Sequence, residues 1–183
     1  MKKENIYIVG DSVIIKSVTE KEIEDYLHIR RFATVFKMAY DAEDELWAHM
    51  RQELIDDVKG ANIVCLIYLI KSKVAIGYIE LEMTDLHHPN VGIGILEEER
   101  KKGYAFEASV LLINRVFENE EIEYIKWMTT EGNEASNRIG LKLGGKLIRT
   151  EPIIPEDVME RWGDEIFKNT KIPSYVVYGI YRQ

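Results

Sequence analysis

The chain has 183 residues, of which 46% are hydrophobic and 31% are charged, and its formal net charge is −8. This length can bury one sizeable core, so we expect a single domain over residues 1–183. An acidic chain is poorly suited to nucleic acids or anionic membranes, because binding to phosphates depends on an excess of Lys and Arg. No run approaches the roughly 18 apolar residues of a membrane span, and the chain start leads into a strand-like run, so we expect a cytoplasmic protein.

The first half of the chain combines strand and helix patterns. Thr19 followed by Glu22 has the spacing of a capping box, which opens a helix toward Ile29. Two apolar runs joined by a turn at 71–73 predict an antiparallel hairpin. The strands expected in this half cover 12–18, 62–70, 74–83 and 91–96, and the helices cover 19–29 and 42–58.

The second half begins with a helix over 103–119 that carries two adjacent apolar stripes and should pack broadly on a sheet. Further strands are expected at 124–130, 147–148 and 175–181, and further helices at 133–143 and 156–168. Together these elements predict a mixed α/β fold with a mostly antiparallel sheet flanked by helices.

Cysteine and histidine usage gives no sign of a metal site. Cys65 is the only cysteine and lies in the apolar run 63–67, so we expect a buried, inert thiol and no disulfide. His87 and His88 are adjacent in an expected loop, but a histidine pair without a third ligand is weak evidence for a metal. We therefore expect no metal ion.

The segment between the strand at 91–96 and the helix at 103–119 has the chemistry of an anion site. A helix N-terminus offers unpaired N–H groups, and its macrodipole also favours an anion. Gly103 removes a side chain where a ligand must approach, and Ala105 keeps the first turn slim. Taken alone, a basic run before a helix is more often a solvated face, and the acidic residues at 97–99 oppose an anion. The loop residues are Arg100, Lys101, Lys102, Gly103, Tyr104 and Ala105.

Residues 94–108 resemble motif A of the GNAT acetyltransferase superfamily, whose signature is Gln or Arg, two residues, Gly, one residue, then Gly or Ala. Arg100, Gly103 and Ala105 stand at those three places. Farther along, residues 133–144 resemble a second motif of the branch that includes ribosomal-protein N-terminal (alanine) acetyltransferases: an Asn, a Ser three residues later, and a Lys-x-Gly ending. The resemblance is clear over residues 74–148 and implies the GNAT acyl-CoA N-acyltransferase fold.

The resemblance implies acetyl-CoA as the co-substrate, with its phosphates on the loop and its pantetheine along a splayed strand at 91–96. Gly92 and Gly94 would ease that distortion, or would merely relieve packing against a helix. Asn133 reaches the pantetheine arm in the family, although capping its own helix is a complete structural explanation. The implied cofactor-binding residues are Ile95, Leu96, Arg100, Lys101, Lys102, Gly103, Tyr104, Ala105 and Asn133.

Acetyl transfer from a thioester to an amine needs a neutral nucleophile and a proton for the departing thiolate. The family's usual acid is a Tyr seven residues after the Asn, and this chain has Gly140 there. The resemblance therefore leaves Ser136 as the candidate acid, or as a simple hydrogen-bond donor in the first helical turn. Glu80 and Glu82, on one strand face with Tyr78, are the candidate bases; the alternative is a pair of solvated carboxylates on a half-exposed strand.

The acceptor implied by the resemblance is a primary amine of a small molecule or a protein N-terminus, bound by a monomer or homodimer. We expect it to enter between residues 30–47 and the region after Arg149, where aromatic and acidic residues suit a cationic ligand with apolar bulk. Core packing and a solvated surface explain these residues equally well. They are Phe32, Phe36, Tyr40, Trp47, Trp162, Glu43, Asp44, Glu45, Glu151, Glu156 and Asp157. A non-catalytic acyl-CoA-binding regulatory module and an interaction domain stay open as alternative functions.

Overall fold

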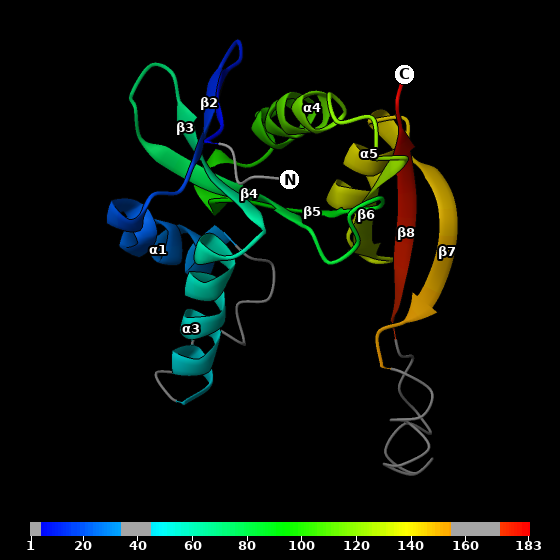
Figure 1. Ribbon diagram of the computed structural model, residues 1–183, viewed down its shortest axis with the longest axis horizontal. Coiled ribbons are helices and arrows are strands. Elements are labelled where there is room, and N and C mark those ends of the chain that lie inside the picture. Colours follow the sequence, from blue (N-terminus) through cyan, green and yellow to red (C-terminus); the bar gives the residue numbers. More distant parts are fainter. Residues whose placement is uncertain (1–4, 34–44, 155–172) are drawn as a thin grey trace. The chain divides into compact units, whose positions relative to one another are not determined.

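The computed structural model describes residues 5–33, 45–154 and 173–183. The chain forms two compact units, Met1–Glu123 and Tyr124–Gln183. Their helices and strands are labelled in Figure 1. The helix expected at 156–168 lies outside the described residues.

The first unit contains five strands that follow one another across a sheet, and each pairs antiparallel with the next. The alternating and apolar runs of the sequence thus form the hairpin and the added strand that were predicted. Ser17, Cys65, Ile79 and Ile93 lie side by side across four of these strands. The strands are β1 (Tyr7–Val9), β2 (Val13–Ser17), β3 (Ile63–Leu69), β4 (Ala75–Glu82) and β5 (Asn90–Ile95).

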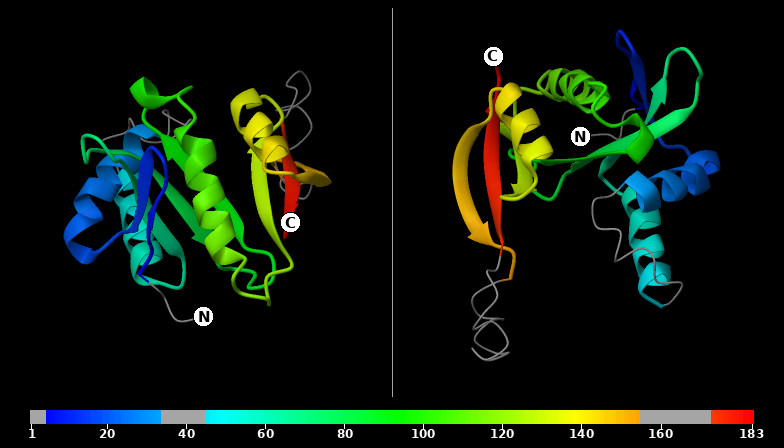
Figure 2. Two further views of the ribbon diagram at one scale, coloured as in Figure 1. Left: turned by 90° about the horizontal axis from the view of Figure 1, so that it is seen from above. Right: turned by 180° about the vertical axis from the view of Figure 1, so that it is seen from behind.

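Helices cover both faces of this five-stranded sheet. α1 and α3 lie on one face and α4 lies on the other (Figures 1 and 2). The predicted capping interaction is present at the start of the first helical segment, where the Thr19 N–H donates to Glu22 Oε2 at 3.1 Å. The helical segments are η1 (Glu20–Glu22), α1 (Ile23–Ala33), α3 (Glu45–Lys59), η2 (Glu97–Glu99) and α4 (Tyr104–Val116).

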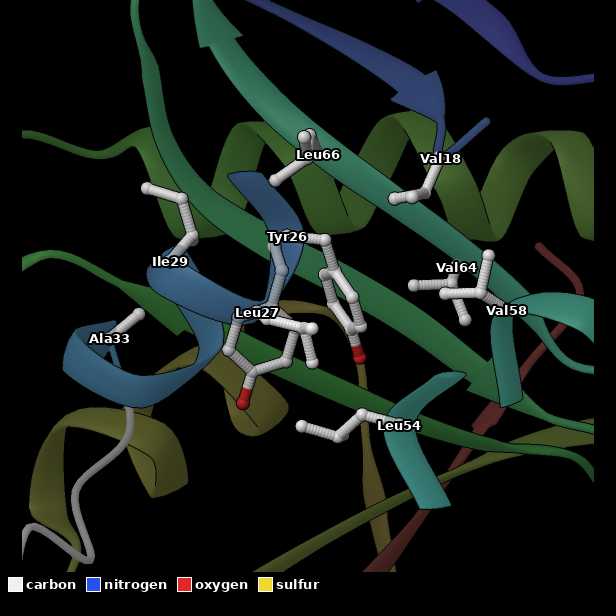
Figure 3. Close-up of a cluster of buried hydrophobic side chains, with 10 residues drawn as sticks. Val18, Tyr26, Leu27, Ile29, Ala33, Leu54, Val58, Val64 and Leu66 are labelled. Carbon is white, nitrogen blue, oxygen red and sulfur yellow. The ribbon is translucent and has the colours of Figure 1, made fainter. Parts of the chain in front are cut away.

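The core between α1, α3 and the sheet is shown in Figure 3. Side chains of α1 such as Tyr26 and Leu27 pack with Leu54 of α3 and with Val64 and Leu66 of β3. Fully burying an aliphatic side chain of this size contributes about 1.5–3 kcal/mol. Successive residues of β3 and β4 are buried over most of each strand, so both faces of these strands are covered. β4 is therefore not the half-exposed strand that was the alternative expectation for Glu80 and Glu82.

The Glu107 side chain joins α4 to the turn between β1 and β2 by accepting hydrogen bonds from backbone N–H groups; we call this contact the Glu107 clamp. The Gly10 N–H donates to the Val13 carbonyl at 2.8 Å and closes the turn. The Glu107 carboxylate then accepts the N–H groups of Ser12 at 2.8 Å and Val13 at 3.2 Å. A Cβ at position 10 would lie 2.4 Å from Glu107 Oε1, so a side chain there would displace this carboxylate from the turn.

The second unit is a three-stranded antiparallel sheet in the order β6, β8, β7, with α5 packed against β6 and β8. Trp127 of β6 pairs with Tyr178 of β8. The register between β7 and β8 shifts at Ile148, and almost all of β7 is exposed. The elements are β6 (Tyr124–Thr130), α5 (Glu134–Lys142), β7 (Lys146–Pro152) and β8 (Ser174–Tyr181).

Candidate active site

The loop before α4 presents backbone N–H groups at the helix N-terminus. Gly103 is the N-cap residue with φ of 90°, and Lys101 also has a positive φ, of 62°. The first helical bond runs from the Glu107 N–H to the Gly103 carbonyl at 3.1 Å. Because glycine has no side chain with which to cap the helix, no N-cap side chain competes with a ligand for the first turn. A Cβ built on Gly103 would meet nothing within 4 Å, so the space in front of this turn is open.

The three cations of the loop differ in their surroundings. Arg100 donates from Nε to the Ile95 carbonyl at 2.9 Å and from Nη2 to the Ala33 carbonyl at 3.3 Å, so it ties the ends of β5 and α1 together. Lys102 Nζ bonds Glu99 at 2.9 Å, and this bond raises the pKa of Lys102. Lys101 is exposed and has no ion-pair partner among the described residues. Lys101 is thus the cation most open to an anion.

At the end of β5, the Leu96 N–H points toward β4, whereas the backbone groups of Ile95 point away from it. The Leu96 N–H donates to the Ile76 carbonyl at 2.9 Å across the ladder with β4. Since antiparallel ladders alternate, the N–H and carbonyl of Ile95 face away from β4. The Ile95 carbonyl accepts Arg100, while its side chain is buried.

Gly92 and Gly94 make room for large side chains of the neighbouring strand. Gly92 lies opposite Glu80 and Gly94 opposite Tyr78. A Cβ on Gly92 would come within 2.6 Å of Glu80 Oε1, and one on Gly94 would collide with the Tyr78 ring. These glycines therefore let β4 side chains lean across β5.

Glu80 lies in a buried polar cluster. It is 7% exposed, its Oε1 is 3.1 Å from Arg30 Nη2, and its Oε2 accepts the Tyr26 hydroxyl at 3.2 Å. Arg30 also donates to the Tyr78 hydroxyl and stacks 4.3 Å from the centre of that ring. Burial raises the pKa of Glu80, and the Arg30 charge opposes that rise. Arg30 was not predicted as part of the site, because no local sequence pattern indicates that it pairs with Glu80, 50 positions away.

Glu82 has different surroundings from Glu80. Its side chain is exposed, and its Oε2 accepts a hydrogen bond from Asn90 Nδ2 at 3.1 Å. The two candidate bases thus separate into one buried, ion-paired carboxylate and one exposed carboxylate.

In the second unit, Asn133 caps α5 through its side chain. Its Oδ1 accepts the N–H of Ser136 at 3.1 Å. Trp127 Nε1 donates to Ser136 Oγ at 3.1 Å and to the Ser136 carbonyl at 3.2 Å. Asn137 anchors the same turn by donating to the Thr130 carbonyl at 2.9 Å, and the Tyr178 hydroxyl donates to Asn137 Oδ1 at 2.9 Å.

Packing explains why position 140, where the resemblance leads one to expect a tyrosine, is a glycine. A Cβ on Gly140 would lie 2.8 Å from Trp127 Cδ1, closer than side chains approach one another. The indole thus fills the space that a side chain at 140 would need. Trp127 was not singled out in the sequence, where it is one aromatic residue in an expected strand.

Most of the expected acceptor residues lie outside the described parts of the chain; these are Phe36, Tyr40, Glu43, Asp44, Glu156, Asp157 and Trp162. Of the rest, Phe32 is 47% exposed and packs against His28, with ring centres 4.9 Å apart. Glu151 is bonded to Arg149 at 2.6 Å.

The described residues contain neither a metal-binding cluster nor a membrane-spanning helix. In those ranges, no group of three or more His, Cys, Asp or Glu side chains is arranged to hold a metal ion. His88 is bonded instead to Asp85 at 3.0 Å and Glu123 at 3.3 Å. No helix in the described ranges is both long and apolar enough to cross a bilayer.

Comparison with known proteins adds the family. A model of the acetyltransferase (GNAT) domain matches residues 12–146. A search of curated proteins found no match. A GNAT-family acetyltransferase from Bacillus anthracis is 17% identical with a TM-score of 0.71, and the match covers 96% of this chain and 98% of that one.

Two other solved structures have similar folds. An acetyl transferase from Salmonella typhimurium that modifies the N-terminal serine of a 50S ribosomal subunit protein is 12% identical, with a TM-score of 0.69 and coverage of 96% and 98%. The microcin C7 self-immunity acetyltransferase MccE, in complex with acetyl-CoA and AMP, is 16% identical, with a TM-score of 0.67 and coverage of 94% of both chains. At such identities the likeness shows the fold alone, and it confirms the predicted fold class.

Proposed function

Since this chain belongs to the GNAT acetyltransferase family, we propose that it transfers the acetyl group of acetyl-CoA to a primary amine by direct attack in a ternary complex. The amine nitrogen attacks the thioester carbonyl and forms a C–N bond, and the C–S bond breaks. The amine loses one proton to a base, and the CoA thiolate gains one. The products are an amide and free CoA, and no step of this reaction requires a metal ion.

The observation that carries the proposal is the uncapped N-terminus of α4. Open space in front of Gly103, N–H groups of the first turn and the exposed Lys101 together fit a phosphate group. Arg100 supports this loop from behind by fixing it to β5 and α1. The Ile95 N–H, which faces away from β4, is our candidate donor to the pantetheine arm or the thioester carbonyl.

Gly103→Glu tests the phosphate site, with Gly103→Ala as its matched control. Any side chain at φ of 90° is strained by roughly 1–2 kcal/mol, so both variants lose some stability. Only glutamate adds a negative charge where phosphate is proposed to bind, so its CoA affinity should fall about tenfold or more below that of the alanine variant. Isothermal titration with CoA measures both. Equal affinity of the two folded variants would refute the phosphate site.

For the proton transfers we propose Glu80 or Glu82 as the base and Ser136 as the donor to the thiolate. Glu80→Gln removes a charged partner of Arg30 and should cost about 3 kcal/mol of stability, whereas exposed Glu82→Gln should change it little. A loss of kcat/KM near neutral pH with an unchanged Tm in Glu82→Gln assigns the base to Glu82. Unchanged kcat/KM in both variants would remove both residues from the mechanism.

The acceptor class rests on the family alone: we propose an amine of a small molecule or a protein N-terminus, in the cytoplasm. The similar enzyme from Salmonella typhimurium modifies the N-terminal serine of a ribosomal protein, which supports including protein N-termini in this class. Thiol release from acetyl-CoA should be measured with peptides bearing free N-termini and with small amines. A protein that binds CoA but releases no thiol with any amine would instead be an acyl-CoA-binding regulatory module.

A further inference from the structure

Trp127 is placed to control the hydroxyl of Ser136. Its side chain is 2% exposed, beneath the first turns of α5. The indole N–H is shared between Ser136 Oγ at 3.1 Å and the Ser136 carbonyl at 3.2 Å. A buried indole N–H needs an acceptor, so this contact stabilises the packing as well as orienting the serine.

The shared bond fixes which way the serine proton can point. A hydroxyl has one O–H and two lone pairs, and the Trp127 N–H occupies one lone pair. The O–H cannot also point toward the indole, because two hydrogens would then collide. Among the residues the structure describes, no acceptor takes this proton, so it is free for a ligand. A hydroxyl that accepts a hydrogen bond is also a better donor, because hydrogen bonds in a chain polarise one another.

The position of the Trp127 ring leaves no room for a side chain at position 140. The indole Cδ1 lies 2.8 Å from where a Cβ of residue 140 would be, and Nε1 lies 3.2 Å from it. A tyrosine at 140 and the observed placement of Trp127 are therefore mutually exclusive. This chain has the tryptophan and no side chain at 140, and the indole N–H of Trp127 points to Ser136.

We propose that Trp127 is a positioning residue that aligns the Ser136 hydroxyl as a proton or hydrogen-bond donor to the departing thiolate. This inference rests on the proposed acetyl transfer. Trp127 touches no reacting atom and acts through Ser136. In this chain the Trp127 indole occupies the space that a side chain at position 140 would need.

The hydrogen bond can be tested without any activity. In a ¹⁵N-labelled sample, the indole N–H resonance missing from Trp127→Phe belongs to Trp127. Ser136→Ala removes the Oγ acceptor and leaves the carbonyl, so this resonance should move in Ser136→Ala. An unmoved resonance would overturn the inference.

The functional role requires a double-mutant cycle on acetyl transfer. Ser136→Ala should lower kcat on the order of 100-fold, and Trp127→Phe about 2- to 10-fold through the lost hydrogen bond. KM for both substrates should stay within about twofold, since neither change removes ground-state binding. In the Ser136→Ala background, Trp127→Phe should cause no further loss of kcat. Losses that multiply instead would show that Trp127 does not act through Ser136.

Two controls separate positioning from general damage. Tyr178→Phe removes a partly buried hydrogen bond to Asn137 in the same turn of α5 but leaves Ser136 untouched, so kcat should stay at the wild-type value. If Trp127→Phe fails to fold, benzothienylalanine at 127 keeps the bicyclic ring and replaces only the N–H by sulfur. A full wild-type kcat in that protein would overturn the inference. A wild type that binds CoA but transfers no acetyl group would refute the proposed function instead, and the indole resonance would still report the bond.

Discussion

At the scale of single residues, Gly140 shows how closely the second unit is packed. A methyl group there would lie 2.8 Å from the Trp127 ring, so Gly140→Ala forces the indole or α5 to shift. We expect a loss of about 1–3 kcal/mol in the free energy of unfolding, measured by urea denaturation. Gly132→Ala is the control, because a Cβ there meets nothing within 4 Å. Equal losses in the two variants would contradict this account.

Glu80 illustrates where residue-level reasoning from the sequence ends. The alternation of Tyr78, Glu80 and Glu82 with apolar neighbours indicates a strand with one solvated face, yet Glu80 is 7% exposed. The difference arises because α1 brings Arg30 to that face, a contact between residues 50 positions apart. The glycines of β5 did give a clue in the sequence. Gly92 and Gly94 lie opposite Glu80 and Tyr78 and leave room for these large side chains to turn inward.

At the scale of elements, the sequence predicted more of the fold than of the site. Periodicity and capping predicted most strands and helices of the described ranges, since each signal is local. They missed the short β1 (Tyr7–Val9), ended α1 four residues early at 29 and gave only 147–148 of β7 (Lys146–Pro152). The sequence also indicated the uncapped start of α4, because Gly103 has no side chain. It could not indicate that Arg100 is held by the Ala33 and Ile95 carbonyls, or that Trp127 bonds Ser136, since both depend on tertiary packing.

The cap of α5 separates a structural role of Asn133 from a binding role. Asn133→Ala removes the acceptor of the Ser136 N–H and should cost about 1 kcal/mol of stability, whereas Asn133→Ser keeps a good N-cap. If the Asn133 amide also holds the pantetheine arm, both variants should lose CoA affinity although only one loses stability. Calorimetry of unfolding and of CoA binding measures the two effects. Wild-type CoA affinity in Asn133→Ser would leave capping as the whole role.

The connection between β4 and β5 is fastened by His88, which should give this element a pH dependence. Partial burial lowers the pKa of His88, but hydrogen bonds with Asp85 and Glu123 outweigh it and raise the pKa above 6.5. Stability from the protonated ring is therefore complete below pH 6.5 and is lost as the pH rises through the raised value.

His88→Gln should accordingly lower Tm at about pH 6, and the gap to wild type should close by about pH 9. Differential scanning calorimetry across this range provides the measurement. His28→Gln is the matched control, since His28 is exposed on α1 and forms no ion pair among the described residues. A gap that stays constant with pH would show that His88 contributes through packing alone.

At the scale of the whole molecule, the chain offers no thiol for an acetyl-enzyme intermediate. Cys65 is the only cysteine, and its side chain is fully buried in β3 between neighbouring strands. We expect Cys65→Ala to keep kcat within about threefold of wild type, with any loss reflecting a small cavity. Intact-protein mass spectrometry after incubation with acetyl-CoA alone should show no acetylation at Cys65. A kinetically competent acetyl-Cys65 species would require a two-step mechanism.

The clamp between Glu107 and the first turn also affects how the chain is made. Ser12 and Glu107 are 95 positions apart, so the bonds from Glu107 to the N-terminal turn can form only after the ribosome has made the start of α4, although β1 and β2 pair with each other through their own ladder. At typical rates of synthesis, of about 5–20 residues per second, the nascent hairpin waits about 5–20 seconds with the N–H groups of Ser12 and Val13 unsatisfied by Glu107. The Glu107 bonds to this turn are therefore added after the hairpin residues have been synthesised, at a time set by the pace of elongation.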